Sequence, residues 1–159
     1  IDEKRFKNRD GAKIRRKYNL KNDPIVLFVG RISPHKGIHI LIDIFKTILN
    51  DIPNAKLLIV GKQTFGRYMD KLKRMSDKSV IFTGFVEDSE LKDYYDACDV
   101  YATASLWEGF DLPVAEAQIC GKSVVAFNNC SHPEVVRNGW LVKSKDEFVN
   151  LLVRMINDK

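Results

Sequence analysis

Two basic side chains in a short glycine-flanked loop are the first candidates for chemistry. Arg31 and Lys36 stand five residues apart in Gly30-Arg-Ile-Ser-Pro-His-Lys-Gly37, after an apolar run and just before a helical pattern. Two cations at that place suit a diphosphate, because charged donors bind phosphate oxygens strongly. The spacing is equally compatible with two solvated loop charges. The loop is not a G-x-x-x-x-G-K-[ST] sequence and the chain has no G-x-G-x-x-G, which disfavours nucleoside triphosphatases and dinucleotide enzymes.

Two glutamates eight residues apart form the second candidate pair. Glu108 lies in a glycine-containing turn after an apolar run, and Glu116 lies in the first turn of the next helical segment. With this offset both carboxylates can face one crevice, and carboxylates are good acceptors for sugar hydroxyls. A glutamate near a helix N-terminus also complements the helix dipole, which is the structural alternative for Glu116.

The elements that must position these loops alternate between short apolar runs and segments of helical periodicity. We expect six strands, at residues 25–30, 56–61, 80–83, 100–104, 123–127 and 140–142. We expect helices at residues 38–52, 65–75, 88–98 and 113–120, and a closing helix from the capping box at 144–147. Asp88 is the expected cap of its helix, and Pro113 the first residue of the next.

Parallel neighbouring strands need crossover helices, so this order predicts an α/β fold with a doubly wound, parallel, six-stranded, Rossmann-like sheet. Ligands of such sheets bind outside the carboxyl ends of the strands, where the strand order reverses. We expect that point between the first and fourth strands. The two candidate loops follow those strands.

Length and composition predict one soluble globular domain: 159 residues, 45% apolar and 30% charged. We expect no membrane span or secretory leader, because no apolar stretch approaches the ~20 residues that cross a bilayer. The cysteines are odd in number and form no C-x-x-C, which favours a reducing cytoplasm over disulfides. No metal site is expected, because the histidines lie in different elements: His35, His39 and His132.

The net charge of +5 is concentrated at the start of the chain. Residues 1–21 hold nine Lys or Arg and three Asp or Glu, a balance of +6, so the remainder carries −1. Such a segment could contact nucleic acid or an anionic membrane. We favour a solvated, partly helical arm without nucleic-acid binding, since the rest of the sequence shows no basic face.

The two candidate loops resemble those of a known family. Glu108-Gly-Phe-Asp-Leu-Pro-Val-Ala-Glu116 resembles the E-x7-E motif of the family 4 retaining glycosyltransferases, the "glycosyl transferases group 1" domain of GT-B enzymes. Phe28-Val-Gly-Arg31-Ile-Ser-Pro-His-Lys36-Gly resembles the diphosphate loop of that family. Further similarities follow in the expected order at residues 80–86, 117–126 and 133–136. The opening residues 1–6 are similar to the segment that links the two halves of these enzymes.

The resemblance implies that the chain is the donor-binding C-terminal half of a GT-B enzyme. Residues 1–21 would be a basic linker or helical arm, and residues 22–159 the nucleotide-sugar-binding domain. Arg31 and Lys36, with Gly30 in the same loop, would grip the donor diphosphate and stabilise it as it leaves, in place of a metal ion. The helix near Pro113 would add backbone N–H groups to the same phosphates.

The resemblance also implies how the rest of the donor is bound. Glu116 would accept hydrogen bonds from the ribose, and Glu108 would position the transferred sugar. The turn beside Glu108 would approach that sugar through its backbone: Gly109, Phe110, Asp111 and Leu112. A second segment would lie beside the nucleobase: Gly84, Phe85 and Val86.

The sequence departs from the usual pattern of the family in four places: at Asp111, at Cys130-Ser131, in the turn Asn138-Gly139-Trp140, which is shorter than usual, and at Ala104, which replaces a common proline. Asp111 stands where glycine is usual, and aspartate tolerates unusual backbone angles better than most residues. Cys130 and Ser131 replace a frequent Gly-Gly pair. These departures bear on sugar and acceptor specificity more than on the class of reaction.

The expected function is transfer of a hexose from a nucleotide diphosphate sugar to a saccharide or lipid-linked acceptor. Mannose from GDP-mannose is the first expectation, ahead of UDP-glucose or UDP-N-acetylglucosamine, and no cofactor is expected. The chain alone should be inactive, because the acceptor site would lie in a missing N-terminal half. We expect a cytoplasmic protein with peripheral contact to the inner face of the membrane as an option. A GT-B sugar-nucleotide epimerase and a non-enzymatic nucleotide-binding module are the alternatives.

Overall fold

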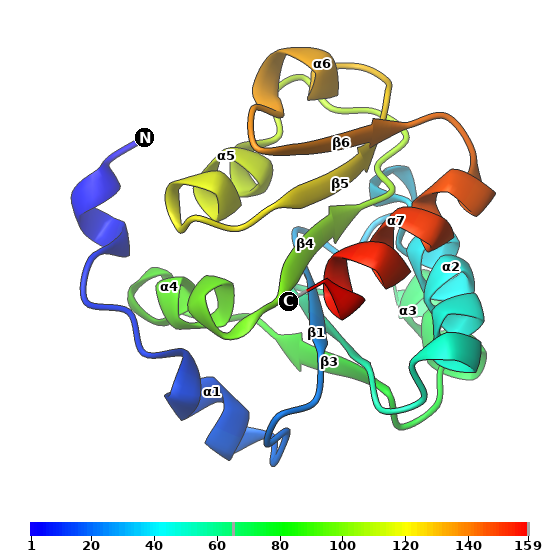
Figure 1. The fold of residues 1–159 in the computed structure, drawn as a ribbon, viewed down its shortest axis with the longest axis horizontal. Coiled ribbons are helices and arrows are strands. Elements are labelled where there is room, and N and C mark those ends of the chain that lie inside the picture. Colours follow the sequence, from blue (N-terminus) through cyan, green and yellow to red (C-terminus); the bar gives the residue numbers. More distant parts are fainter. Residues whose placement is uncertain (65, 159) are drawn as a thin grey trace.

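A six-stranded parallel sheet forms the centre of the molecule (Figure 1). The computed structural model describes residues 1–64 and 66–158. The strand order is β3-β2-β1-β4-β5-β6, which confirms the doubly wound sheet and places the reversal between the first and fourth strands. The strands are β1 (Ile25–Val29), β2 (Lys56–Val60), β3 (Val80–Gly84), β4 (Val100–Thr103), β5 (Val124–Phe127) and β6 (Gly139–Val142).

Helices cover both faces of the sheet (Figure 1). One core lies under α2 (Ile38–Asp51), α3 (Gly66–Met75) and α7 (Lys145–Asn157). The other lies under α1 (Gly11–Lys17), α4 (Asp88–Ala97) and α5 (Leu112–Ile119). Successive residues of β1 alternate between these two cores, since strand side chains alternate in direction. This two-sided burial explains why the strands read as continuous apolar runs.

The roles predicted for Asp88 and Pro113 at their helix starts are each wrong by one residue, because a different residue caps each helix. Glu87 is the N-cap of α4, so Asp88 is its first helical residue rather than its cap. Asp111 is the N-cap of α5, and Pro113 is the second helical residue. Asp111 has a φ of −87° and a ψ of 86°, so it does not adopt the left-handed conformation that favours glycine. The predicted start of the second helix at Phe65 lies outside the described residues.

Three short helical segments lack the length for a periodic signal and were not predicted as separate elements. They are η1 (Glu3–Phe6), η2 (Pro34–Lys36) and α6 (His132–Val135). Four residues make about one turn, so no repeat of apolar positions marks such a helix. Two of these segments, η2 and α6, lie in the loops that build the site.

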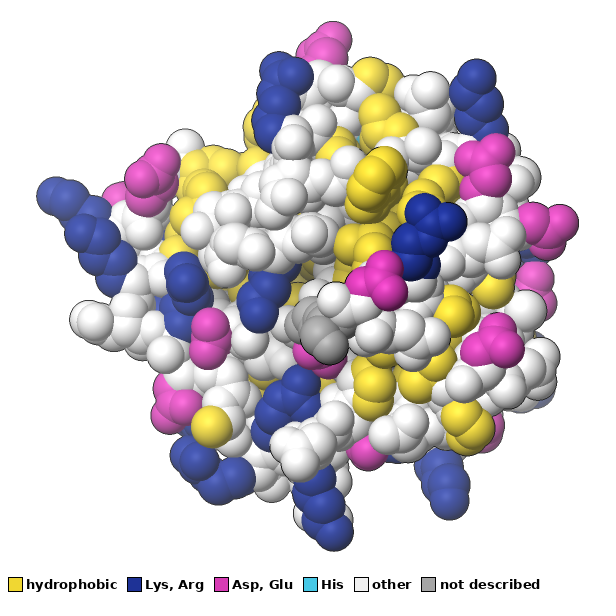
Figure 2. All heavy atoms as spheres, in the orientation of Figure 1, with side chains coloured by type: hydrophobic (Ala, Val, Ile, Leu, Met, Phe, Trp, Pro, Cys, Tyr) yellow, Lys and Arg dark blue, Asp and Glu magenta, His cyan; other side chains and the backbone are white. Residues whose placement is uncertain are grey.

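The basic arm is partly helical, as predicted, but it is packed rather than solvated. Three of its apolar side chains are buried in the second core: Phe6, Ile14 and Leu20. Its cations pair with acids on or just beyond α4, including Arg9 with Asp96 at 3.5 Å and Arg15 with Asp99 at 3.3 Å. On the face seen in Figure 2, Lys and Arg are interspersed with Asp and Glu rather than gathered in one patch. None of the helices in the described ranges has the length and apolar content needed to cross a membrane.

Candidate active site

The loops after β1 and β4 meet at the reversal of strand order. The two strands pair in parallel, so both loops leave the same edge of the sheet. The N–H of Leu106 donates to the carbonyl of His35 at 2.8 Å. Gly37 has a φ of 65°, and a Cβ at this position would lie 1.9 Å from the carbonyl oxygen of Ala104. Only glycine fits this approach, so the two loops are held together through their backbones.

Lys36 and Glu108, predicted from separate motifs, form an ion pair across these loops. Lys36 Nζ lies 2.5 Å from Glu108 Oε1, and the Ser105 hydroxyl donates to the same oxygen at 3.1 Å. Both side chains are shielded, with 14% of Lys36 and 9% of Glu108 exposed. The pair places a cation and a carboxylate at the mouth of the switch point. A phosphate and a sugar hydroxyl would each find a complementary group there.

Arg31 lies in the same loop as Lys36 but away from the ion pair. Its side chain is exposed, and no hydrogen bond or ion pair joins it to another residue in the described part of the chain. Gly30 lies under Lys36: a Cβ on Gly30 would lie 3.8 Å from Lys36 Cδ and 3.0 Å from the Phe28 ring. The structure therefore brings Lys36 to Glu108 and leaves Arg31 free to approach a ligand.

Asp111, at the other end of the turn, forms a buried pair with His132 of α6. Asp111 Oδ2 lies 3.0 Å from His132 Nε2, and His132 Nδ1 lies 2.9 Å from the Phe127 carbonyl. The exposed fraction is 4% for the Asp111 side chain and 0% for that of His132. Burial lowers the pKa of His132, but the bonds to Asp111 and Phe127 outweigh burial, so the pKa is raised. No local pattern in the sequence indicates this pair, because its two residues lie 21 positions apart.

Glu116 is buried in α5 and bound to α4. Its Oε2 accepts a hydrogen bond of 2.8 Å from the Tyr95 hydroxyl, and the residue is 4% exposed. Burial raises the pKa of its carboxyl, and the Tyr95 bond only partly opposes this. Tyr95 is itself fully buried and packs edge-on against Phe6 at 6.1 Å between ring centroids. No described contact joins Glu116 to Glu108, so the two glutamates occupy separate environments.

Large exposed apolar side chains, here called the rim, follow β3 and β4 along the chain. Phe85 follows β3 and is 67% exposed, and Gly84 before it has a φ of 74°. Val86 is half-buried against the second core. The β4–α5 loop contributes the other members of the rim: Leu106, Trp107, Phe110 and Leu112. Gly109 has open space where a Cβ would stand, so its backbone is accessible to a ligand.

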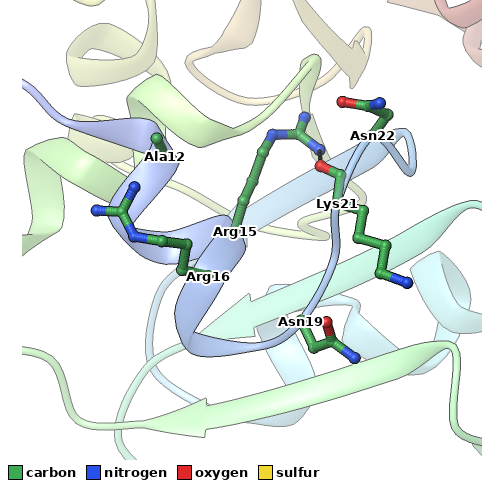
Figure 3. A pocket seen from close by; sticks show the side chains of 6 residues that line it. All are labelled: Ala12, Arg15, Arg16, Asn19, Lys21 and Asn22. Carbon is green, nitrogen blue, oxygen red and sulfur yellow. Dashed lines mark hydrogen bonds between the residues drawn. The ribbon is translucent and has the colours of Figure 1, made fainter.

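A hollow elsewhere on the surface does not coincide with these residues. It lies beside the start of β1 and is lined by Ala12, Arg15, Arg16, Asn19, Lys21 and Asn22 (Figure 3). The Arg15 guanidinium there donates to the carbonyls of Lys21 at 3.0 Å and Asp23 at 2.8 Å. Arg15 therefore stabilises the turn into β1. Over residues 1–64 and 66–158, no group of three or more His, Cys, Asp or Glu is arranged to hold a metal ion.

The chain matches a known protein family over most of its length. Residues 10–159 match the family described as "Glycosyl transferases group 1". A GDP-mannose-dependent alpha-(1-6)-phosphatidylinositol monomannoside mannosyltransferase of Mycolicibacterium smegmatis is 31% identical over 140 residues, 80% of this chain and 36% of that protein. Such curated relatives are longer, and the chain spans between 15% and 39% of their length.

Solved structures agree with this match. The crystal structure of Anabaena HepE in complex with UDP and glucose has a TM-score of 0.90 at 31% identity, covering 99% of this chain and 46% of that one. The C-terminal domain of a glycosyl transferase group 1 family protein (LpcC) from Francisella tularensis has a TM-score of 0.76 at 28% identity. It covers 99% of this chain and 88% of that one.

Proposed function

The chain belongs to the glycosyl transferases group 1 family, and from this premise we propose that it is the donor-binding C-terminal half of a retaining GT-B glycosyltransferase. The complete enzyme transfers a hexose from a nucleotide diphosphate sugar to a saccharide or lipid-linked acceptor. The observation that carries the proposal is the shielded pair of Lys36 and Glu108 at the switch point of the sheet. Nothing in the comparisons favours the epimerase alternative.

Lys36 and Arg31 bind the diphosphate in this proposal. Lys36 Nζ has three N–H donors, so it can keep its bond to Glu108 and still donate to a phosphate oxygen. Arg31 is exposed at the same edge and can close on the second phosphate. The N-terminus of α5 adds backbone N–H groups. These donors stabilise the negative charge that develops as the diphosphate leaves.

Glu108 positions the transferred sugar and Glu116 the ribose. Ser105 and Lys36 both bind Oε1 of Glu108, which leaves Oε2 for a sugar hydroxyl. Tyr95 binds only Oε2 of Glu116, so Oε1 is available to a ribose hydroxyl. Gly109 supports backbone contact with the sugar because the space beside it is open. Gly84 ends β3, and Phe85 and Val86 follow it at the same edge; these three residues flank the nucleobase.

We propose GDP-mannose as the donor, with UDP-glucose as the competing choice. A relative that is named as GDP-mannose-dependent supports the first, and the HepE complex with UDP and glucose supports the second. Titration calorimetry of the chain with GDP, UDP, GDP-mannose and UDP-glucose decides between them. A chelator should leave the affinity unchanged, because the proposal assigns the phosphates to protein cations. Absence of binding by all four ligands would overturn the proposed function.

The basic arm, residues 1–21, bears on where the enzyme acts in the cell. We place the enzyme in the cytoplasm, with the basic arm as a contact to anionic lipid. Several of its cations form no ion pair within the described part of the chain, and these are the ones available for that contact: Lys4, Lys7 and Lys17. Sedimentation with phosphatidylserine vesicles at low and high salt tests this part separately from donor binding.

A further inference from the structure

Residues 129–132, which lead from β5 into α6, contact the β4–α5 loop on both sides of Glu108. The Asn129 side-chain amide donates to the carbonyl of Ser105 at 3.2 Å, and Cys130 Sγ lies 3.5 Å from the carbonyl of Leu106. Beyond Glu108, His132 holds Asp111. Three contacts from four consecutive residues thus fix the start and the end of the turn that carries the proposed sugar-binding carboxylate.

The chemistry of the His132 contact sets its protonation state. Both ring nitrogens face acceptors, the Phe127 carbonyl and the Asp111 carboxylate. Two acceptors require two N–H donors, which only the doubly protonated ring supplies. Asp111 uses its other oxygen, Oδ1, to cap α5 through the N–H of Val114 at 3.4 Å. The pair therefore ties the turn to α6 and to the N-terminus of α5.

We infer that the Asp111–His132 pair is a positioning device that holds the turn, and with it Glu108, in register with Lys36 for as long as His132 carries both protons. The inference rests on the proposed function for the role of Glu108, and on geometry alone for the tether. Both side chains act through Glu108, so neither side chain is assigned a contact with substrate.

The ionisable surroundings of His132 give the direction of its pH dependence. Asp111 and Glu108 approach from the β4–α5 loop, and both raise the pKa of His132. The Phe127 carbonyl of β5 also raises this pKa, whereas burial lowers it. On β4, Tyr101 is buried near Asp111, and its pKa is raised well above the usual range by burial and then by Asp111, so it stays neutral. The other acid of α6, Glu134, is exposed.

The sign of the effect follows from the net raised pKa. The tether contributes fully below the usual pKa of histidine, and its contribution is lost as the pH rises through the raised pKa of folded His132. The turn should therefore loosen toward alkaline pH. A merely structural histidine that is neutral when folded would show the opposite dependence.

Trp107 reports the position of the turn without any ligand. It is adjacent to Glu108 and 66% exposed, and replacing the other tryptophan by Trp140→Phe leaves it as the single indole. We expect acrylamide quenching of Trp107 to increase as the pH is raised through the pKa of folded His132. His132→Gln and Asp111→Asn should abolish this transition. Asparagine keeps the cap of α5, so Asp111→Asn separates the tether from the fold.

Controls and a second readout make the outcome decisive. His39→Gln is the matched control, because His39 Nδ1 is bonded to the Tyr68 hydroxyl at 2.7 Å between α2 and α3, outside the turn. It should keep the Trp107 transition. A transition that is absent from the Trp140→Phe protein, or that persists in both tether variants, overturns the inference.

The affinity for donor separates the inference from the proposed function. His132→Gln should weaken binding of the sugar nucleotide by about tenfold, the loss of one hydrogen bond to a charged group, and binding of the nucleoside diphosphate by less than about twofold. Equal losses for both ligands would overturn positioning of Glu108. If the unmodified chain binds neither ligand, the proposed function fails. The pH dependence of Trp107 quenching still tests the Asp111–His132 pair in that case, because it needs no ligand.

Discussion

Replacing Lys36 by methionine should destabilise the fold by a predictable amount, because it leaves the shielded Glu108 carboxylate without its cation. Removing one partner of a buried ion pair costs about 3–5 kcal/mol. Here the Ser105 hydroxyl remains bonded to Glu108, and both members of the pair touch solvent to a small extent. We therefore expect a loss of about 1–3 kcal/mol in the free energy of unfolding.

A double-mutant cycle isolates the interaction between the two side chains. Glu108→Gln removes the charge at nearly constant volume, and Lys36→Met/Glu108→Gln removes both charges. The double variant should be more stable than the sum of the single losses implies, with a coupling of about 1–2 kcal/mol. Urea unfolding followed by circular dichroism measures all four proteins, provided that the denaturant dependence is equal among them.

A surface pair supplies the control for this cycle. Lys145 and Asp43 lie 2.8 Å apart, but 55% of each side chain is exposed. Lys145→Met should therefore cost less than about 1 kcal/mol. Additive losses for Lys36 and Glu108, within about 0.5 kcal/mol, would refute the buried pair as a stabilising contact.

Further substitutions test other parts of the site. Gly37→Ala should lower the free energy of unfolding by more than about 3 kcal/mol, since its Cβ would overlap the Ala104 carbonyl at positive φ; a loss below about 1 kcal/mol in urea unfolding would contradict the close approach. Burial raises the pKa of Glu116, so the stability of the unmodified chain relative to Glu116→Gln should fall as the pH rises from the usual pKa of a carboxyl through the raised pKa of folded Glu116, and a constant difference would contradict this. Glu116→Gln should weaken the nucleoside diphosphate and the sugar nucleotide alike, whereas Glu108→Gln should weaken only the sugar nucleotide; calorimetry that finds the two variants equal removes the division of roles. The isolated chain should bind the donor without transferring sugar. Measurable transfer in a radiolabel assay would contradict the proposal that the chain is only the donor-binding half of the enzyme.

The four central strands, β2, β1, β4 and β5, could be predicted because each is buried on both faces and therefore reads as an apolar run. The topology then placed Lys36 and Glu108 at one edge, although 72 positions separate them in the sequence. The direct contact between these side chains was not predicted, because it depends on how the two loops approach at Gly37. The only mark that such a close approach of backbones makes in the sequence is a glycine, here Gly37.

The parts that could not be predicted depend on side chains that meet without a local pattern. Asp111 was interpreted through its backbone, whereas its carboxylate caps α5 and binds His132. The helix α6 that carries His132 has one turn and no periodicity. Similarly, the charges of the arm suggested a solvated segment, because the acids that neutralise them lie about 80 residues later, in and just beyond α4. The interaction partners of Asp111 and of the basic arm can be identified only once the fold is known.

The backbone contact between the β1 and β4 loops limits how this site can be altered. Because Gly37 lies against Ala104 and Leu106 bonds to His35, an insertion in either loop would displace both Lys36 and Glu108 at once. Changes of substrate are therefore more accessible through side chains that project from this rigid frame. Trp107 and Phe110 project in this way, and they can be exchanged with little effect on folding. Libraries that aim at a new sugar in the proposed donor site should vary these two positions and leave the length of both loops unchanged.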